Sequence, residues 1–227
     1  CALKQHLQVP ALLQGSAPSR TALLLVSDSP TLLVSRLLTS HGYTCQSLNG
    51  DHFVADFDCG HGNQLGSWLS DHGHTYHNEN LCRVWVLAPV DRPGEVHGFF
   101  TLSAHSVNVE DINRSMRRDD PANGNVVNAL PQLPAQLLGK MARSQEGVPP
   151  RFGALLLACV YANYLAANDV TASKFLVADA REPQLIDYYV KNGFVPSQAV
   201  RGGLKTLYKP TKSIARDLTM ALSYQHS

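Results

Sequence analysis

Two adjacent tyrosines, Tyr188 and Tyr189, lie in the stretch REPQLIDYYVKNGFVPS and are well suited to handle a proton. A phenol with its ordinary pKa near 10 is protonated at neutral pH, so it can donate a proton to a reacting group. On a helix, neighbouring residues point about 100° apart, so one can face the core while the other faces a cleft. From the residues alone, two half-buried aromatic rings with satisfied hydroxyls remain the simpler interpretation.

A second chemical feature is the loop 145–153, QEGVPPRFG, which precedes a strongly apolar segment. Backbone N–H groups at the start of a helix bind phosphate groups well. Pro149 and Pro150 have no N–H to offer, whereas the guanidinium of Arg151 can bind phosphate directly. The sequence therefore leaves two interpretations open: a loop that binds phosphate through Arg151, or a rigid surface loop without a ligand.

Basic residues gather in the stretch NRSMRRDD, which contains Arg114, Arg117 and Arg118. Arginine is a strong ligand for RNA phosphates, so contact with an RNA acceptor is one interpretation. The two aspartates that follow partly neutralise the arginines, which favours a solvated loop instead. The formal net charge of the chain is only +1, and this argues against a strong nucleic-acid binder.

Other chemistry-bearing residues carry weaker signals. His72, His74 and His77 lie close together but lack a further ligand, so we predict no metal site. Cys59 is near His61, yet no third catalytic residue accompanies them, and we interpret Cys59 as a small buried residue.

The composition is that of a folded protein, and the longest apolar run does not read as a membrane span. Of the 227 residues, 44% are hydrophobic and 16% charged, so a sizeable core is expected. The apolar run 21–38 is interrupted by Ser, Asp and Pro, which excludes it as a membrane span. The five cysteines form no Cys-x-x-Cys pair, which favours free thiols in the cytoplasm or another reducing compartment.

The positioning elements follow from hydrophobic periodicity and turn residues. We expect residues 1–50 to form an N-terminal extension, with a helix between Ser29-Pro30 and His41-Gly42. From Phe53 onward the pattern predicts, in order, a helix (62–78), an antiparallel hairpin (81–90 with 96–109), a long loop (112–132), a strand (134–143), a helix (154–168), a strand (173–180), a helix (182–192), a strand (204–211) and a terminal helix (212–225). This order predicts a mixed α/β sheet with flanking helices.

Four stretches resemble the GCN5-related N-acetyltransferases, and more narrowly the acetyltransferase toxins of bacterial toxin–antitoxin pairs. They are FDCG at 57–60 with the later Trp68-Leu69, GFFTLSAHSV from Gly98, PAQLLGKMAR from Pro134, and LIDYYVKNGFVPS. The resemblance covers roughly residues 53–218. It implies a GNAT-like domain over residues 51–227.

The resemblance implies acetyl-CoA as cofactor and an amine as acceptor, either an aminoacyl-tRNA or a protein. It also implies an antitoxin or a larger assembly as partner, and a homodimer. Tyr189, five residues before Phe194, matches the family's general acid, while Tyr188 matches a core aromatic residue. The family's cofactor-binding positions correspond to residues of the strand and the loop: Lys140, Met141, Ala142, Gln145, Gly147, Arg151, Phe152 and Gly153.

The cofactor loop departs from the family pattern. Only Gly153 fits, and Arg151 stands where the family has glycine. The departure keeps a second hypothesis open, in which the fold is catalytically degenerate and serves as a structural or binding subunit. No single base is evident; Glu146 and Asp179 are candidates by proximity only, and solvated surface carboxylates are the simpler interpretation.

Overall fold

The computed structural model describes residues 29–60, 62, 64–117 and 129–223. Its centre is a seven-stranded sheet of order β1-β2-β3-β4-β5-β7-β6, in which β4 and β5 are parallel and the other neighbours antiparallel. The strands are β1 (Tyr43–Ser47), β2 (Arg83–Pro89), β3 (Gly98–Asn108), β4 (Gln132–Arg143), β5 (Phe175–Ala180), β6 (Val195–Arg201) and β7 (Leu204–Pro210). The predicted mixed α/β sheet with flanking helices is confirmed.

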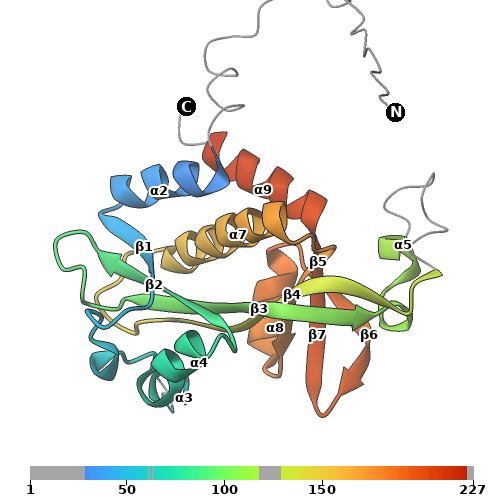
Figure 1. The fold of residues 1–227 in the computed structure, drawn as a ribbon, viewed down its shortest axis with the longest axis horizontal. Coiled ribbons are helices and arrows are strands. Elements are labelled where there is room, and N and C mark those ends of the chain that lie inside the picture. The colour runs from blue at the N-terminus through green and yellow to red at the C-terminus, as the bar shows by residue number, and fades with distance from the viewer. Residues whose placement is uncertain (1–28, 61, 63, 118–128, 224–227) are drawn as a thin grey trace, which may run out of the picture.

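Helices cover both faces of the sheet (Figure 1). The long helices α2, α7 and α9 lie on one face, and the short helices α3 and α4 lie on the other. The α-helices are α2 (Pro30–Ser40), α3 (Gln64–Trp68), α4 (His74–Asn78), α5 (Arg114–Arg117), α7 (Phe152–Val170), α8 (Pro183–Lys191) and α9 (Thr211–Ser223). Three short turns complete the described elements: 3-10 turns η1 (Val54–Asp56) and η3 (Val109–Asp111), and the π-helical turn η2 (Leu69–Gly73).

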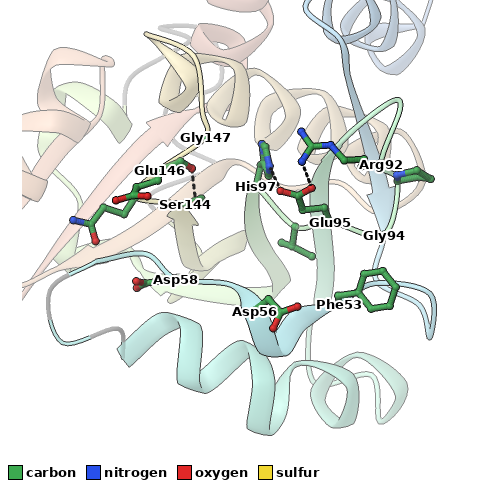
Figure 2. Close-up of a pocket in the computed structure, with 13 residues that line it drawn as sticks. Phe53, Asp56, Asp58, Arg92, Gly94, Glu95, His97, Ser144, Glu146 and Gly147 are labelled. Carbon is green, nitrogen blue, oxygen red and sulfur yellow. Dashed lines mark hydrogen bonds and ion pairs between the residues drawn. The ribbon is translucent and has the colours of Figure 1, made fainter.

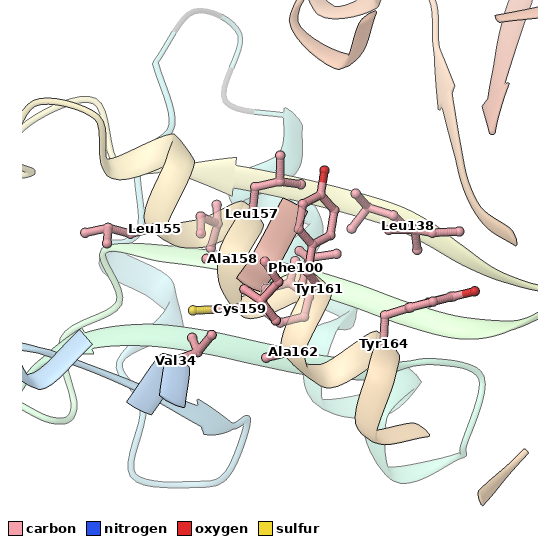
Figure 3. Packing of buried hydrophobic residues seen from close by; sticks show 14 of the residues in the cluster. Val34, Phe100, Leu138, Leu155, Leu157, Ala158, Cys159, Tyr161, Ala162 and Tyr164 are labelled. Carbon is pink, nitrogen blue, oxygen red and sulfur yellow. The ribbon is translucent and has the colours of Figure 1, made fainter. Parts of the chain in front are cut away.

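Helix α7 is the centre of the main core. It is long and apolar enough to cross a membrane by length and composition alone. In this fold, however, ten of its residues are buried, and it packs against the sheet, α2 and α9. Figure 3 shows Tyr161 and Tyr164 projecting from α7 beside Leu138 of β4 and Phe100 of β3. The hydrophobicity of α7 on nearly all sides therefore reflects burial inside the protein.

The alternation of a strand explains the GFF stretch at the start of β3. Phe100 packs in the cluster around α7, whereas Phe99 packs on the opposite face with Phe57 and Leu69. Gly98 is required because a Cβ there would lie 2.8 Å from the ring of Phe152. The strand thus places Phe100 in one cluster and Phe99 in the other, and Gly98 leaves room for Phe152, the first residue of α7.

The first two elements that the structure describes, α2 and β1, belong to the same fold as the rest of the sheet. Ser29 caps α2 by accepting the Leu32 N–H, and Gly42 follows the helix with φ +75°, as the sequence predicted. Strand β1 then pairs along its whole length with β2. The division of the chain at residue 50 stays a prediction, but β1 lies N-terminal to that boundary and belongs to the sheet.

Two segments differ from the sequence-based expectation. Strand β6 was not predicted, because Pro196 and the Gly202-Gly203 pair obscure the apolar pattern around it. Both glycines have positive φ, so they form the tight turn of the β6–β7 hairpin. The predicted long loop 112–132 begins with the one-turn helix α5; its residues 118–128 lie outside the described residues.

Candidate active site

The sheet opens between β4 and β5. These parallel strands pair from Ala135–Phe175 to Leu138–Ala178, and β4 then continues to Arg143 without β5 beside it. The separation begins at a β-bulge, where Gly139 and Lys140 of β4 lie opposite Thr101 of β3. The Thr101 hydroxyl accepts the Lys140 N–H at 3.0 Å and so replaces a lost ladder bond. A bulge bends its strand, and here it directs β4 away from β5.

Beyond the bulge, β4 presents an open backbone edge. The Ser144 N–H donates to the His97 carbonyl, so Ser144 and, two residues earlier, Ala142 direct their backbone groups toward β3. By alternation, the N–H and C=O groups of Met141 and Arg143 point into the opening. A ligand with amide groups can pair with this edge as an added strand would.

The side chains of the predicted cofactor residues in β4 point away from the opening edge. The ammonium of Lys140 lies 4.7 Å above the Trp68 ring on the α3 face. Met141 packs against the α7 cluster, and Ala142 packs against the α3 cluster. Of these three residues, only Met141 therefore offers backbone groups to a ligand in the opening, because the Ala142 backbone points toward β3 and the Lys140 N–H is bonded to Thr101.

The cofactor loop ends in an unusual backbone conformation at Arg151. This residue precedes α7 with φ 64° and ψ 15°, the left-handed region that favours glycine. The side chain of Arg151 is exposed, and the Gly153 N–H is free of any backbone partner in the described part of the chain. The loop thus keeps a glycine conformation but places a guanidinium beside a helix N-terminus.

A cavity of about 600 Å³ lies at this loop. Its lining joins the end of β4, the loop with the first turn of α7, and α8: Arg143, Val148, Pro149, Pro150, Arg151, Phe152, Gly153, Ala154, Tyr188 and Asn192. The cavity therefore brings two arginines to the N-terminus of a helix, which is an environment that suits a phosphate group.

The other predicted loop residues have different positions. The Gln145 N–H donates to the Asp58 carbonyl at 2.9 Å, and Gly147 lies beside His97 with φ +74°. Both line a second, larger cavity. Phe152 is 1% exposed and packs edge-on against Tyr43, so its side chain anchors α7 in the core.

The larger cavity, of about 930 Å³, is mainly acidic (Figure 2). Its charged lining contains four carboxylates and one arginine: Asp56, Asp58, Glu95, Glu146 and Arg92. Arg92 is already paired with Glu95, and Glu95 also contacts the buried His97 at 2.8 Å. Like charge disfavours phosphate here, so the smaller cavity between β4 and α8 is the better site for a phosphorylated ligand.

The two tyrosines occupy different environments, with Tyr188 at the smaller cavity. Tyr188 is half-buried, and its hydroxyl donates to the Gly153 carbonyl at 3.1 Å. Tyr188, expected as the core residue of the pair, is thus the one that lines the cavity. Burial raises the pKa of Tyr188 above its ordinary value.

Tyr189 is 4% exposed and packs 5.0 Å from Phe194 in the α7 cluster, which also contains Leu138 and Ala178 at the end of the parallel ladder. Burial raises the pKa of Tyr189, and the neighbouring Tyr188 raises it further. Among the described residues, two buried side-chain atoms lack a hydrogen-bond partner, His52 Nε2 and Asn113 Oδ1. The Tyr189 hydroxyl is not one of them.

The predicted RNA-binding arginines are only partly described. Arg117 donates to the carbonyls of Ile112 and Glu110, so its guanidinium stabilises the start of α5. Arg114 lies in α5, and Arg118 falls outside the described residues. The structure therefore gives Arg117 a local structural role and leaves RNA contact a prediction.

The remaining candidate residues lie in different surroundings. Asp179 accepts from the Thr206 hydroxyl at 2.7 Å, and Glu146 lines the acidic cavity. His77 Nδ1 accepts the Val84 N–H, and its Nε2 lies 3.4 Å from the Ser47 hydroxyl. These contacts place His77 in the packing of α4 against the sheet.

One contributor to the loop was missed at the sequence level. Asp58, within the FDCG stretch, binds the Gly60 N–H with its side chain and the Gln145 N–H with its carbonyl. The Asp-x-Gly spacing is a signal for such a turn. Its contact with a loop 87 residues away was not readable from the sequence.

No protein-family model matches the sequence, and no curated protein matches it. Solved structures do match. AtaT complexed with acetyl-methionyl-tRNAfMet is 21% identical with a TM-score of 0.65, and the match covers 77% of this chain and 98% of that one. AtaTR bound with AcCoA is 23% identical with a TM-score of 0.63, covering 78% and 98%. A tyrosine-to-phenylalanine variant of KacT is 20% identical with a TM-score of 0.65, covering 77% and 98%.

At these identities the likeness shows the fold. It is the fold of the acetyltransferase toxins, which confirms the resemblance inferred from the four sequence stretches.

Proposed function

We propose that this protein is an acetyl-CoA-dependent N-acetyltransferase. The observation that carries the proposal is the opening between β4 and β5, with a free backbone edge on β4 and a helix N-terminus beside it. A long, flexible ligand with amide groups at one end and phosphates at the other matches this arrangement. Acetyl-CoA has both, and the fold is shared with AtaTR bound with AcCoA.

The residues present fit the two chemical parts of acetyl-CoA. Its pyrophosphate would lie at the smaller cavity, held by the Arg151 guanidinium, Arg143 and the Gly153 N–H. Its amide-containing arm would pair with the backbone of Met141 and Arg143 along the open edge of β4. Arg151 supplies the donors that Pro149 and Pro150 cannot offer.

Tyr189 is proposed as the general acid. With acetyl-CoA bound, Tyr189 would donate its phenolic proton to the thiolate that leaves as the acceptor amine takes the acetyl group, and the proton released by the amine would return to the phenolate through water. The raised pKa of Tyr189 makes the phenol a weaker acid. An apolar site would also disfavour the departing thiolate, because burial penalises any anion, and this favours uptake of the proton by the thiolate.

The acceptor is proposed to be the α-amine of an aminoacyl-tRNA. Support comes from the fold shared with AtaT in its complex with acetyl-methionyl-tRNAfMet. An antitoxin partner is proposed because the related AtaT toxin has been solved bound to the C-terminus of the antitoxin AtaR. A homodimer and a cytoplasmic location complete the proposal, on the resemblance to the toxins.

A second candidate is a catalytically degenerate subunit with a structural or binding role. Pro149 and Pro150 favour it, because two consecutive residues of the phosphate loop have no N–H. Thermal melting with acetyl-CoA separates the two candidates. At about 100 times its Kd, a ligand stabilises the native state by about 2.7 kcal/mol. For a chain of this size that raises the midpoint by about 5–10 °C.

No rise at millimolar acetyl-CoA would contradict the enzyme and support the degenerate subunit. If binding is found, transfer of radiolabelled acetyl groups to a mixed aminoacyl-tRNA pool tests the acceptor. Tyr189→Phe should then reduce kcat at least tenfold with little change in acetyl-CoA affinity. The neighbouring Tyr188→Phe is the matched control, and it should alter acetyl-CoA affinity more than kcat. Equal kcat for Tyr189→Phe and the wild type would exclude Tyr189 as the acid.

A further inference from the structure

A buried lysine lies behind the helix that carries the two tyrosines. The side chain of Lys209, in β7, is 1% exposed, and its ammonium forms an ion pair with Asp217 of α9 at 2.7 Å. Burying a charge is costly unless every donor finds a partner, so such a group is retained only where its contacts are fully specified.

The second partner of Lys209 is the backbone carbonyl of Asn192, at the C-terminal cap of α8. The same carbonyl accepts the Tyr161 hydroxyl from α7 at 3.3 Å. The ammonium also lies 4.8 Å above the Tyr161 ring and 5.7 Å from the Phe194 ring. A cation at a helix C-terminus interacts favourably with the helix dipole, and here it is fixed from three sides.

The turn held by Lys209 is directly connected to Tyr189. The Asn192 N–H contacts the Tyr189 carbonyl at 3.0 Å, and the Phe194 N–H also donates to that carbonyl. The Tyr189 and Phe194 rings pack 5.0 Å apart. Gly193 completes the turn with φ +79°, and a Cβ there would lie 3.0 Å from the Lys209 ammonium. The turn, the ammonium and the ring of Tyr189 therefore form one closely packed unit.

We propose that Lys209 and Asp217 form a latch that joins helix α9 to the C-terminal turn of α8 and thereby positions Tyr189. Lys209 is a positioning residue, because it acts through the Asn192 carbonyl and touches no reacting atom. The inference rests on the proposed function in one respect, the role of Tyr189 as acid. Its structural part, the control of the Tyr189 position from α9, stands independently.

The latch is tested with two variants and one control. Lys209→Met removes the ammonium while keeping a side chain of similar length. Asp217→Asn keeps the shape of a side chain that is 28% exposed but removes the charge that pairs with Lys209. Arg216→Gln is the matched control, because Arg216 contacts the other oxygen of Asp217 and is largely exposed. The control changes the charge beside Asp217 without changing the contact with Asn192.

The first readout does not require activity. With ¹³C-labelled tyrosine, the Tyr189 ring signal is assigned from its loss in Tyr189→Phe and followed in each folded variant. The signal should shift or broaden in Lys209→Met and, more weakly, in Asp217→Asn, and it should be unchanged in Arg216→Gln. An unchanged Tyr189 signal in both latch variants overturns the proposal. If Lys209→Met is too unstable to study, an unchanged signal in Asp217→Asn overturns it.

The second readout is kinetic. Lys209→Met should lower kcat at least tenfold and Asp217→Asn about threefold, with acetyl-CoA affinity within twofold of the wild type. In the Tyr189→Phe background, Lys209→Met should have no further effect on kcat, because the two residues act as one unit. Equal losses in both backgrounds would mean a general structural role and overturn the latch. If wild-type protein binds no acetyl-CoA while the Tyr189 signal still moves, the proposed function fails and the latch is supported.

Discussion

Replacing Arg151 by glycine is expected to stabilise the fold and weaken the ligand site at the same time. Arg151 has φ 64°, a conformation that costs a non-glycine residue about 1–2 kcal/mol. Its side chain is exposed, so little packing is lost on removal. The added flexibility of glycine in the unfolded chain costs about 0.4–1 kcal/mol. The net gain is therefore about 0–1.6 kcal/mol, equivalent to a rise of up to roughly 6 °C in the midpoint.

The effect on acetyl-CoA has the opposite sign. Hydrogen bonds to charged groups contribute about 1.5–3 kcal/mol each. Losing the Arg151 guanidinium should therefore raise the acetyl-CoA Kd roughly tenfold or more. Thermal melting without ligand gives the stability, and isothermal titration calorimetry gives the affinity of the same preparation.

A matched control is Asn80→Gly, at the other described non-glycine residue with positive φ. Asn80 lies away from the loop cavity and accepts a hydrogen bond from Arg83. Its replacement should change stability by about 1 kcal/mol or less without affecting acetyl-CoA binding. A lower midpoint for Arg151→Gly would refute the strain argument. Unchanged affinity would refute the role of Arg151 as a phosphate ligand.

Three further predictions concern packing and charge. Gly98→Ala should lower the unfolding free energy by about 1–3 kcal/mol in urea denaturation, because the new Cβ would lie 2.8 Å from Phe152; a neutral result would mean that the ring has room to move. Phe99→Ala should lower it by about 3–5 kcal/mol, since the ring is fully buried, and a loss below about 1 kcal/mol would contradict the packing described. Burial is the largest single influence on the pKa of Asp217 and raises it, but the hydrogen bonds from Lys209 and then Arg216 lower the pKa overall. The ionised Asp217 carboxylate therefore stabilises the folded protein above the unfolded pKa near 3.9. This stabilisation is lost as the pH falls through the folded pKa. Urea unfolding between pH 5 and 3 should depend less on pH in Asp217→Asn than in the wild type, and equal dependence would exclude this role.

Much of the fold was predictable because local patterns and tertiary structure agree. The period of β2, β3 and β4, the apolar run of α7 and the Ser29-Pro30 start of α2 each predict the element that forms. Strand β6 was missed because its proline and glycines weaken the local pattern, and its pairing with β7 is a tertiary contact.

The candidate site was less predictable, because its parts come together across the fold. The sequence identified Arg151 and the tyrosine pair, but it did not show that Gln145 and Gly147 would line a different cavity from Arg151 and Gly153. Nor did it show which tyrosine would line the smaller cavity. A rotation of about 100° between neighbours separates their environments, and only the packing of the helix decides which one is buried.

Most of the order of strands and helices could be predicted from the sequence, with β6 as the exception, and so could the presence of an arginine at a position where the family has glycine. Each follows from side-chain size, periodicity or backbone freedom at single positions. The folded structure was needed to show where β4 leaves β5, that Gly98 makes room for Phe152, that Lys209 is buried against Asn192, and that the acidic and basic cavities lie apart. These depend on contacts between residues far apart in the chain, whose geometry is fixed only when the sheet and its helices pack together.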